Sequence, residues 1–288
     1  MRSRTLPALL LLAALASPAV AVPGPPTWYT KADEATREAQ RSGRPILVDL
    51  YAAWCGWCKE LDRNVFSTPR FQQFARDFVL LRVDTEDGGE GTELNDRYQV
   101  QSLPTTLLLD GDRILLGKVE GYAPTDEYIG EIQQELKEFA DYETRAKAAL
   151  AGTDLAEQKG AAAEAHLRGD GKRAAALYRK LAASGDVPAP VAGALQYMLA
   201  DALRLSRDWE GAAAALKRAR EEAQKVHDSD LLERTEMLAT NVAQESGDCK
   251  GAKDRLERFL IEHPKSGLAS QAKRALRAIE TDKSAQCT

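Results

Sequence analysis

The feature that most constrains the fold is an apolar run followed almost at once by two cysteines. Residues 46–51 are apolar except for Asp49, and this pattern predicts a buried strand. The motif Cys55-Gly56-Trp57-Cys58 follows, and its cysteines lie one turn apart if a helix begins there. At a helix start, unpaired backbone N–H groups and the positive end of the helix dipole favour the thiolate form of Cys55. The pattern therefore predicts a strand and then a helix with a reactive dithiol in its first turn.

The two cysteines are expected to have different roles. Cys55 should be the nucleophile, and Cys58, which we expect to lie deeper, should then attack the mixed disulfide that Cys55 forms with a substrate. The alternatives are half of a zinc site or a structural disulfide. The sequence has no second pair of this spacing, and its histidines all lie in the later part of the chain, at His166, His227 and His263. We therefore predict a redox-active Cys55–Cys58 disulfide and neither a metal nor a cofactor.

Helix and strand patterns alternate around this motif. The expected helices span residues 31–42, the stretch from the cysteines to about 64, 71–78, 94–98 and 125–150, and the expected strands span 46–51, 79–84, 106–109 and 114–119. Residues 86–93 are acidic and rich in glycine, which predicts a loop. A solvated loop is favoured over a Ca²⁺ site because the alternating oxygen ligands of known Ca²⁺ loops are missing. This order of elements predicts an α/β domain over residues 28–140.

Beyond residue 150 the sequence is rich in alanine, has helical periodicity and shows no convincing strand. Three blocks align with one another, and each ends in an alanine: Ala174, then Ala212 after 38 residues and Ala252 after another 40. We assign residues 141–157 to a helical linker and residues 158–288 to all-α repeats, which form hairpins as far as Pro264 and end in a capping helix. The blocks resemble the tetratricopeptide family, although their spacing exceeds its usual ~34 residues; a generic bundle of helical hairpins is the alternative.

The cysteine segment is similar to the active-site segment of the thioredoxin superfamily. Residues 48–59 follow that segment almost residue for residue, and Leu103-Pro104-Thr105 matches the family's cis-proline loop. The resemblance implies an α/β thioredoxin fold, with a central mixed sheet flanked by helices, and thiol–disulfide oxidoreductase activity. It also implies a cis bond before Pro104, which would face the cysteines so that the backbone of Leu103 pairs with a substrate strand. Trp54, Gly56, Trp57 and Thr105 would complete the surroundings of the site, and Gly121 matches a glycine of the last strand.

By the same resemblance, Asp49 occupies the place of a buried carboxylate behind the resolving cysteine. It would accept the proton of Cys58, although a buried acid kept only for packing is the alternative. Leu80 stands where many thioredoxins keep a lysine, so we expect nothing to stabilise the charged carboxylate. Trp57 replaces a common proline, so no thioredoxin-like reduction potential can be carried over. The segment from Trp54 to Phe71 looks more like the envelope thioredoxin-like proteins, including the C-terminal domain of the DsbD transmembrane reductant, than like cytosolic thioredoxin.

The first 21 residues predict an exported protein. Arg2 and Arg4 precede a short apolar stretch, and small residues end at Ala21, after which we expect cleavage. The stretch is too short for the ~20 residues of a membrane anchor. Residues 22–27 contain three prolines and should form an extended lead-in. The mature chain is therefore expected in an oxidising compartment, with the bacterial periplasm as the natural candidate.

Two cysteines remain outside the motif, Cys249 and Cys287. In an oxidising compartment we expect them to form a structural disulfide that ties down the capping helix. A second redox couple or bonds between chains are the alternatives.

The function expected from these patterns is exchange of dithiol and disulfide with client proteins. The repeats would dock clients or a redox partner, for which a membrane protein of the DsbD type is a candidate. The 39 basic and 44 acidic residues leave a net charge of −5, which argues against nucleic acid as a partner. The alternative, from another class, is a periplasmic scaffold or assembly protein in which the thioredoxin fold is only a binding module. The sequence does not distinguish a reductant from an oxidant or an isomerase.

Overall fold

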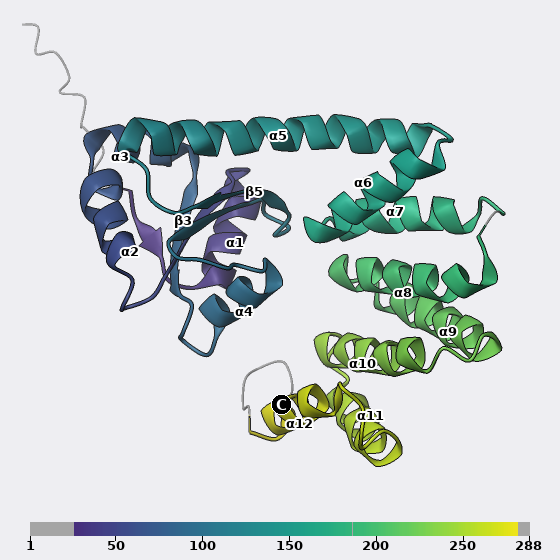
Figure 1. The fold of residues 1–288 in the computed structure, drawn as a ribbon. Helices are drawn as coiled ribbons and strands as arrows, with labels where there is room; N and C mark the ends of the chain where they lie inside the picture. The colour runs from purple at the N-terminus through teal and green to yellow at the C-terminus, as the bar shows by residue number, and fades with distance from the viewer. Residues whose placement is uncertain (1–25, 186, 282–288) are drawn as a thin grey trace, which may run out of the picture.

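A computed structural model describes residues 26–185 and 187–281. An α/β part comes first in the chain, a single long helix leaves it, and a series of helical hairpins follows (Figure 1). Every described element after the last strand is a helix. The predicted fold class, a thioredoxin-type α/β fold followed by an all-α region, is confirmed.

The α/β part is built on a mixed sheet of five strands in the order β1-β3-β2-β4-β5. Its strands are β1 (Trp28–Tyr29), β2 (Ile46–Tyr51), β3 (Val79–Asp84), β4 (Thr105–Leu109) and β5 (Leu115–Glu120). The first three strands run parallel to one another, whereas β4 and β5 form an antiparallel hairpin that pairs with β2. Only β1 was not predicted, because two residues are too few to show strand periodicity.

Helices cover both faces of this sheet. One face packs against α2 (Gly56–Leu61), the π-helical turn η1 (Asp62–Phe66), α3 (Pro69–Phe74) and α5 (Thr125–Ala151). The other face packs against α1 (Ala32–Ser42) and α4 (Glu90–Arg97). Successive residues of a strand point to opposite faces, so Leu47 lies in the first core and its neighbours Ile46 and Val48 in the second. Asp49 thereby points to the face covered by α2.

The start of α4 corrects the expectation of a loop from residue 86 to residue 93. The helix begins at Glu90, four residues before the predicted start. The carboxylate of Asp87 accepts hydrogen bonds from the backbone N–H groups of Gly89, Gly91 and Thr92, and so caps the first turn. A Cβ on Gly91 would lie 1.9 Å from the carbonyl oxygen of Asp84. The glycine therefore allows a close approach inside folded structure and does not mark a loop.

The active-site helix also differs from its prediction. The α-helical turns end at Leu61, and a π-helical turn follows in which the backbone N–H of Ser67 donates to the carbonyl oxygen of Asp62. The next predicted helix begins at Pro69 and closes with a 3₁₀ turn, η2 (Ala75–Asp77). Turns of the π type are frequent near functional sites because they change the direction of side chains within a helix.

The helical part consists of three consecutive hairpins and a last helix. The hairpins pair α6 (Leu155–Leu167) with α7 (Gly171–Ala182), α8 (Ala189–Leu205) with α9 (Trp209–Lys225), and α10 (Ser229–Glu245) with α11 (Cys249–Glu262), and α12 (Ala269–Thr281) follows. The second helix of each hairpin is capped by an aspartate, and the aligned alanine four residues later is completely buried. The aligned blocks therefore mark equivalent turns, while membership of the tetratricopeptide family stays a prediction.

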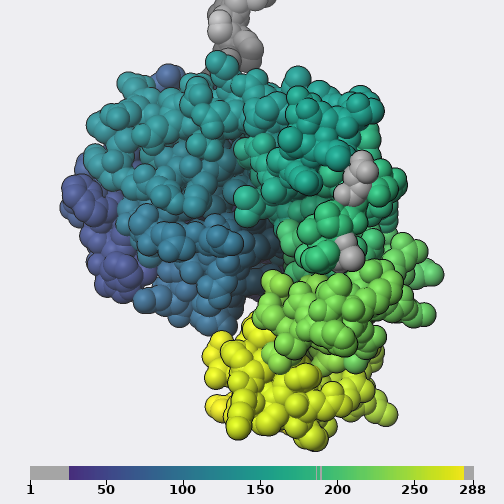
Figure 2. Space-filling model, turned by 45° about the vertical axis from the view of Figure 1, so that its right-hand side comes forward, coloured from purple at the N-terminus to yellow at the C-terminus, as the bar shows by residue number. Residues whose placement is uncertain are grey.

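The two parts are packed against each other. Helix α5 contributes Ile129 and Ile132 to the core of the sheet, and Tyr142 and Ala146 to the core of the helical part. At the junction, the backbone N–H of Leu115 donates to the carbonyl oxygen of Arg168 at 2.7 Å, so the α6–α7 turn covers the start of the edge strand β5. Figure 2 shows the helical region lying directly against the α/β part. The predicted domain limits, with a linker over 141–157, stay predictions.

Several predictions fall on residues that the structure does not describe. The signal peptide over residues 1–21, most of the lead-in over 22–27, and Cys287 lie outside the described residues. Cys249 is the first residue of α11. Its pairing with Cys287 stays a prediction. Within the described ranges, no helix has both the length and the apolar character needed to cross a membrane.

Candidate active site

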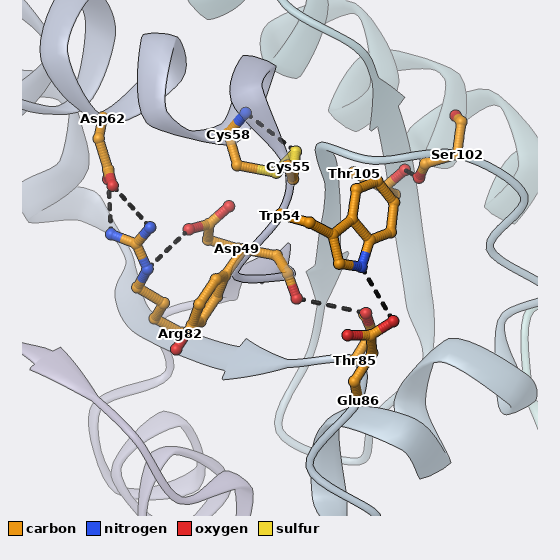
Figure 3. Close-up of a disulfide and its surroundings, with 11 residues drawn as sticks. Asp49, Trp54, Cys55, Cys58, Asp62, Arg82, Thr85, Glu86, Ser102 and Thr105 are labelled. Atoms are coloured by element: carbon orange, nitrogen blue, oxygen red, sulfur yellow. Dashed lines mark hydrogen bonds and ion pairs between the residues drawn. A yellow bond between two sulfur atoms is a disulfide. The ribbon is translucent and has the colours of Figure 1, made fainter.

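Cys55 and Cys58 form a disulfide at the beginning of α2, with sulfur atoms 2.00 Å apart (Figure 3). Cys55 is the N-cap residue of this helix, and its sulfur accepts a hydrogen bond from the backbone N–H of Cys58 at 3.0 Å. The same N–H would stabilise a thiolate at Cys55 after reduction. Both cysteines are 3% exposed, so their accessibility does not provide the expected difference in depth.

The loop before β4 packs against the disulfide. The peptide bond between Leu103 and Pro104 is cis, and the side chain of Leu103 lies against the two cysteines. The carbonyl oxygen of Pro104 accepts a hydrogen bond from the backbone N–H of Gly121, at 2.8 Å. The hydroxyl of Thr105 donates to the carbonyl oxygen of Ser102, at 2.7 Å. The structure thus brings together the cysteine motif and the Leu103-Pro104-Thr105 loop, two segments that lie far apart in the sequence.

Two tryptophans flank the disulfide on its solvent side. Trp54 and Trp57 are 68% and 61% exposed, which is unusual for side chains of this size. The indole N–H of Trp54 donates to the carboxylate of Glu86, at 2.9 Å, and Trp57 stacks on Tyr122 with ring centroids 5.6 Å apart. Each indole is therefore held on one side and open on the other. Gly56 lies between them in a turn with free space around its Cα, so no close contact there requires a glycine.

Asp49 lies on the buried side of the site. Its side chain is 1% exposed, and neither carboxylate oxygen has a hydrogen bond. Figure 3 shows this carboxylate between the Arg82 guanidinium and Cys58. Burial is the main cause that raises the pKa of Asp49 to about 7. The positive charge of Arg82 lowers this pKa, and the negative charge of Asp62 raises it. A carboxyl group with this pKa exchanges its proton readily near neutral pH.

Arg82 corrects the expectation that nothing stabilises the charged form of Asp49. Its Nε lies 3.2 Å from Oδ2 of Asp49, and the two residues are direct partners in the pairing of β2 with β3. Leu80, at the position where a lysine was looked for, lies two residues earlier on the same face of β3. A cation is therefore present beside Asp49, but it comes from a position two residues further along β3 than the lysine of many thioredoxins. Strand alternation in the sequence could have suggested it, whereas the register of the parallel strands could not be read from sequence.

No metal is assigned to the cysteine site. Among the described residues, a grouping with the spacing of metal ligands occurs at Glu236, Glu262 and His263 in the α10–α11 hairpin, where ligand atoms lie within 4.8 Å of one another. Two of these residues already have other side-chain partners, since Arg220 lies 3.1 Å from Glu236 and Glu233 lies 3.3 Å from His263. In the acidic loop, Asp87 uses its carboxylate to cap α4.

Comparison with known proteins agrees with this geometry. Residues 27–111 match the sequence profile of a family described as thioredoxin-like. The thiol:disulfide interchange protein DsbD of Ralstonia nicotianae is 33% identical over 110 residues, which are 37% of this chain and 18% of that protein. The protein of the same name from Salmonella typhi is 42% identical over 73 residues, which are 25% of this chain and 13% of that protein. The chain thus spans less than a fifth of the length of these curated relatives.

Solved structures give a consistent but weaker likeness. A DsbH oxidoreductase is 19% identical, with a TM-score of 0.38 and coverage of 43% of this chain and 94% of that one. Together, the sheet, the family match and the close cysteine pair define the first part of the chain as a thioredoxin-like domain. The thioredoxin-like match covers residues 27–111, and a region of helical hairpins follows that domain.

Proposed function

We propose that the protein is an exported thiol–disulfide oxidoreductase that uses Cys55 and Cys58. One observation carries the proposal: the two cysteines are joined at the start of α2, with the sulfur of Cys55 on a backbone N–H of the first turn. That N–H stabilises negative charge on Cys55 when the disulfide is reduced. The relatives named thiol:disulfide interchange protein support the same chemistry.

The reaction has two steps. The Cys55 thiolate attacks one sulfur of a client disulfide, a new bond forms between Cys55 and that sulfur, and the other client sulfur leaves as a thiolate. Cys58 then loses its proton and attacks the sulfur of Cys55, which restores the Cys55–Cys58 disulfide and releases the second client thiolate. The client gains two electrons and the protein loses them; the reverse sequence oxidises a client dithiol.

Asp49 acts as the base of the second step in this proposal. Its buried carboxylate lies on the side of Cys58, where it accepts the thiol proton as Cys58 attacks. Trp54, Trp57 and the backbone at Leu103 surround the sulfur atoms from the solvent side and would contact the client segment. Gly56, Pro104 and Thr105 shape the turn and the loop. In this proposal the client segment binds on the solvent side of the disulfide, and Asp49 accepts the proton on the buried side.

The helical hairpins are proposed to dock clients or a redox partner, as tetratricopeptide-like arrays do along their surfaces. The limits that accompany this proposal are a thioredoxin-like domain over 28–140, a linker over 141–157 and repeats over 158–288. We place the protein in the periplasm, after cleavage of the signal over residues 1–21. A membrane protein of the DsbD type is the proposed redox partner. These proposals are supported by the sequence pattern and by the kind of relative that the domain matches.

Thiol reactivity tests the function directly. In the reduced full-length protein at pH 7, Cys55 should alkylate faster than Cys58, as followed by mass spectrometry of the labelled peptides. The variant Cys58→Ala should accumulate a mixed disulfide between Cys55 and a client, because nothing remains to resolve it, whereas Cys55→Ala should form none. A slow, unreactive Cys55 and no adduct with any thiol-bearing client would contradict the proposal and favour the scaffold alternative.

A further inference from the structure

Arg82 is held by three partners at once. Its Nε faces Asp49 at 3.2 Å, and Nη1 and Nη2 donate to the two carboxylate oxygens of Asp62 at 2.5 and 2.7 Å. The guanidinium carbon also lies 4.6 Å from the centre of the Tyr51 ring, within the range of a cation–π contact. A side chain fixed in this way on three sides has one orientation. Figure 3 shows the guanidinium between the carboxylates of Asp49 and Asp62.

The three contacts require an arginine. A guanidinium offers five donors in a planar fork, so it can grip both oxygens of one carboxylate and still point Nε at another. A lysine ammonium is a single point charge without this fork. Asp62 lies in the π-helical turn that directly follows the active-site helix, so its bond to Arg82 also fixes that helix relative to β3. Asp49, Arg82 and Asp62 therefore form one connected group behind the cysteines.

We propose that Arg82 is a positioning residue for the proton transfer from Cys58 to Asp49. The inference rests on the proposed function and deepens it. In the resolving step, the S–H bond of Cys58 breaks and its proton goes to the Asp49 carboxylate. The Cys58 sulfur attacks Cys55, and the client leaves as a thiolate. Arg82 touches none of these sulfur atoms; it orients the carboxylate and adjusts its affinity for the proton.

The charges of the group explain how this adjustment works. With Asp49 ionised, the three side chains carry two negative charges and one positive charge, and the uptake of one proton makes the group neutral. Arg82 opposes proton uptake because it attracts the ionised Asp49, whereas Asp62 favours proton uptake because it repels it. Two neighbours thus shift the pKa of Asp49 in opposite directions, and the variants Arg82→Gln and Asp62→Asn should shift it in opposite directions too.

The test uses full-length reduced protein and a disulfide peptide whose halves carry different fluorophores. Release of the first half reports attack by Cys55, and release of the second half reports resolution by Cys58. Arg82→Gln should move the midpoint of the pH profile of the second release upward by about one pH unit, which makes this step about tenfold slower below the midpoint. Asp62→Asn should move it downward, and Arg82→Lys should lie between Arg82→Gln and the native protein. The first release should keep its own pH midpoint in every variant.

Two controls show whether the effect of Arg82 passes through Asp49 and whether each variant is folded. In an Asp49→Asn background, Arg82→Gln should have no further effect on the second release, because its effect passes through that carboxylate. An equal effect with and without Asp49, or identical midpoints in Arg82→Gln and the native protein, would overturn the inference. If the native protein releases neither half, the proposed function itself fails. Near-ultraviolet circular dichroism checks the packing of each variant, and Arg82→Lys and Asp62→Asn keep the test decisive should Arg82→Gln fold poorly.

Discussion

Asp49 in the α/β part and Asp170 in the helical part are both buried, at 1% and 5% exposed, but their surroundings are opposite. The Asp170 carboxylate accepts the backbone N–H of Arg173 at 3.1 Å and the hydroxyl of Tyr142 at 3.0 Å, and the Arg173 guanidinium lies 2.7 Å away. The carboxylate of Asp49 has no hydrogen bond and faces Arg82 alone as an ion-pair partner among the described residues.

This difference separates structural from chemical use of a buried acid. A carboxylate whose oxygens are all bound stabilises the elements that supply its donors. A buried carboxyl group whose partner is a single cation can change between its protonated and ionised forms near neutral pH, and this suits proton transfer. We therefore assign Asp170 to the architecture of the helical part and Asp49 to the chemistry of the cysteines.

The largest effect on this comparison is expected from Asp170→Ala. The change removes the N-cap of α7 and leaves the Arg173 guanidinium and the Tyr142 hydroxyl without their buried partner. We expect a loss of about 3 kcal/mol in the free energy of unfolding. Urea unfolding followed by helical circular dichroism measures it. If the free energy of unfolding fell by less than is usual for the loss of an exposed helix cap, Asp170 would not have the structural role assigned to it.

Asp49→Asn should act on the reaction. An amide of nearly the same shape cannot take up the proton of Cys58, so the resolving step should slow by about 10²-fold or less, with little change in the attack by Cys55. Stopped-flow measurement of the two steps with a fluorescent disulfide peptide separates them. Equal rates of both steps in the variant and the native protein would reduce Asp49 to a packing residue.

Stability should depend on pH through the same residue. The pKa of Asp49 in the folded chain, about 7, lies above the value of about 4 expected when unfolded, so the folded state binds the extra proton between these values. Stability is therefore lost as pH rises through this window, by about 2 kcal/mol from pH 5 to pH 7. Asp49→Asn removes this loss and should melt at a similar temperature at low pH but higher than the native protein at pH 8. In this variant Arg82 still pairs with Asp62, so no guanidinium is left without an acidic partner. Parallel melting temperatures of the two proteins across this range would contradict the assigned pKa.

The smallest effect is expected from Asp248→Ala, the matched control for Asp170. Asp248 caps α11 in the same way, through the N–H of Gly251 at 2.9 Å, but its side chain is exposed. We expect a loss of about 1 kcal/mol, measured by the same urea unfolding. A loss as large as that of Asp170→Ala would show that the cap alone, and not the buried network, accounts for both.

Local patterns were enough to predict much of the fold. The apolar run around Asp49 and the spacing of the cysteines predicted β2 and the helix after it, and the aligned blocks that end in alanine predicted the turns that enter α7, α9 and α11. These features depend on neighbours along the chain. The start of α4 was misplaced because a glycine required by a close backbone approach looks the same in a sequence as a glycine in a loop.

The buried contacts that escaped prediction, in the site and in the helical part, join residues that lie far apart in the sequence. Arg82 meets Asp49 because of the register between β2 and β3, and Tyr142 meets Asp170 across a separation of 28 residues. Nothing in the local sequence of either partner marks the other. Because Leu80 stands where many thioredoxins keep a lysine, we expected no cation beside Asp49, but Arg82 on the same face of β3 supplies one.

The contact between Arg168 and the start of β5 also bears on how the chain is made. The Arg168 guanidinium donates to the backbone carbonyl oxygens of Leu115 and Leu116, and the carbonyl oxygen of Arg168 accepts the backbone N–H of Leu115, which lies 53 residues earlier in the chain. During synthesis the edge of β5 therefore emerges well before the residue that covers it. An uncovered strand edge invites pairing with another chain. Association between chains is therefore most to be expected in the interval before the first hairpin has been synthesised. Dilution or a chaperone that binds the unfinished α/β part would help most in that interval.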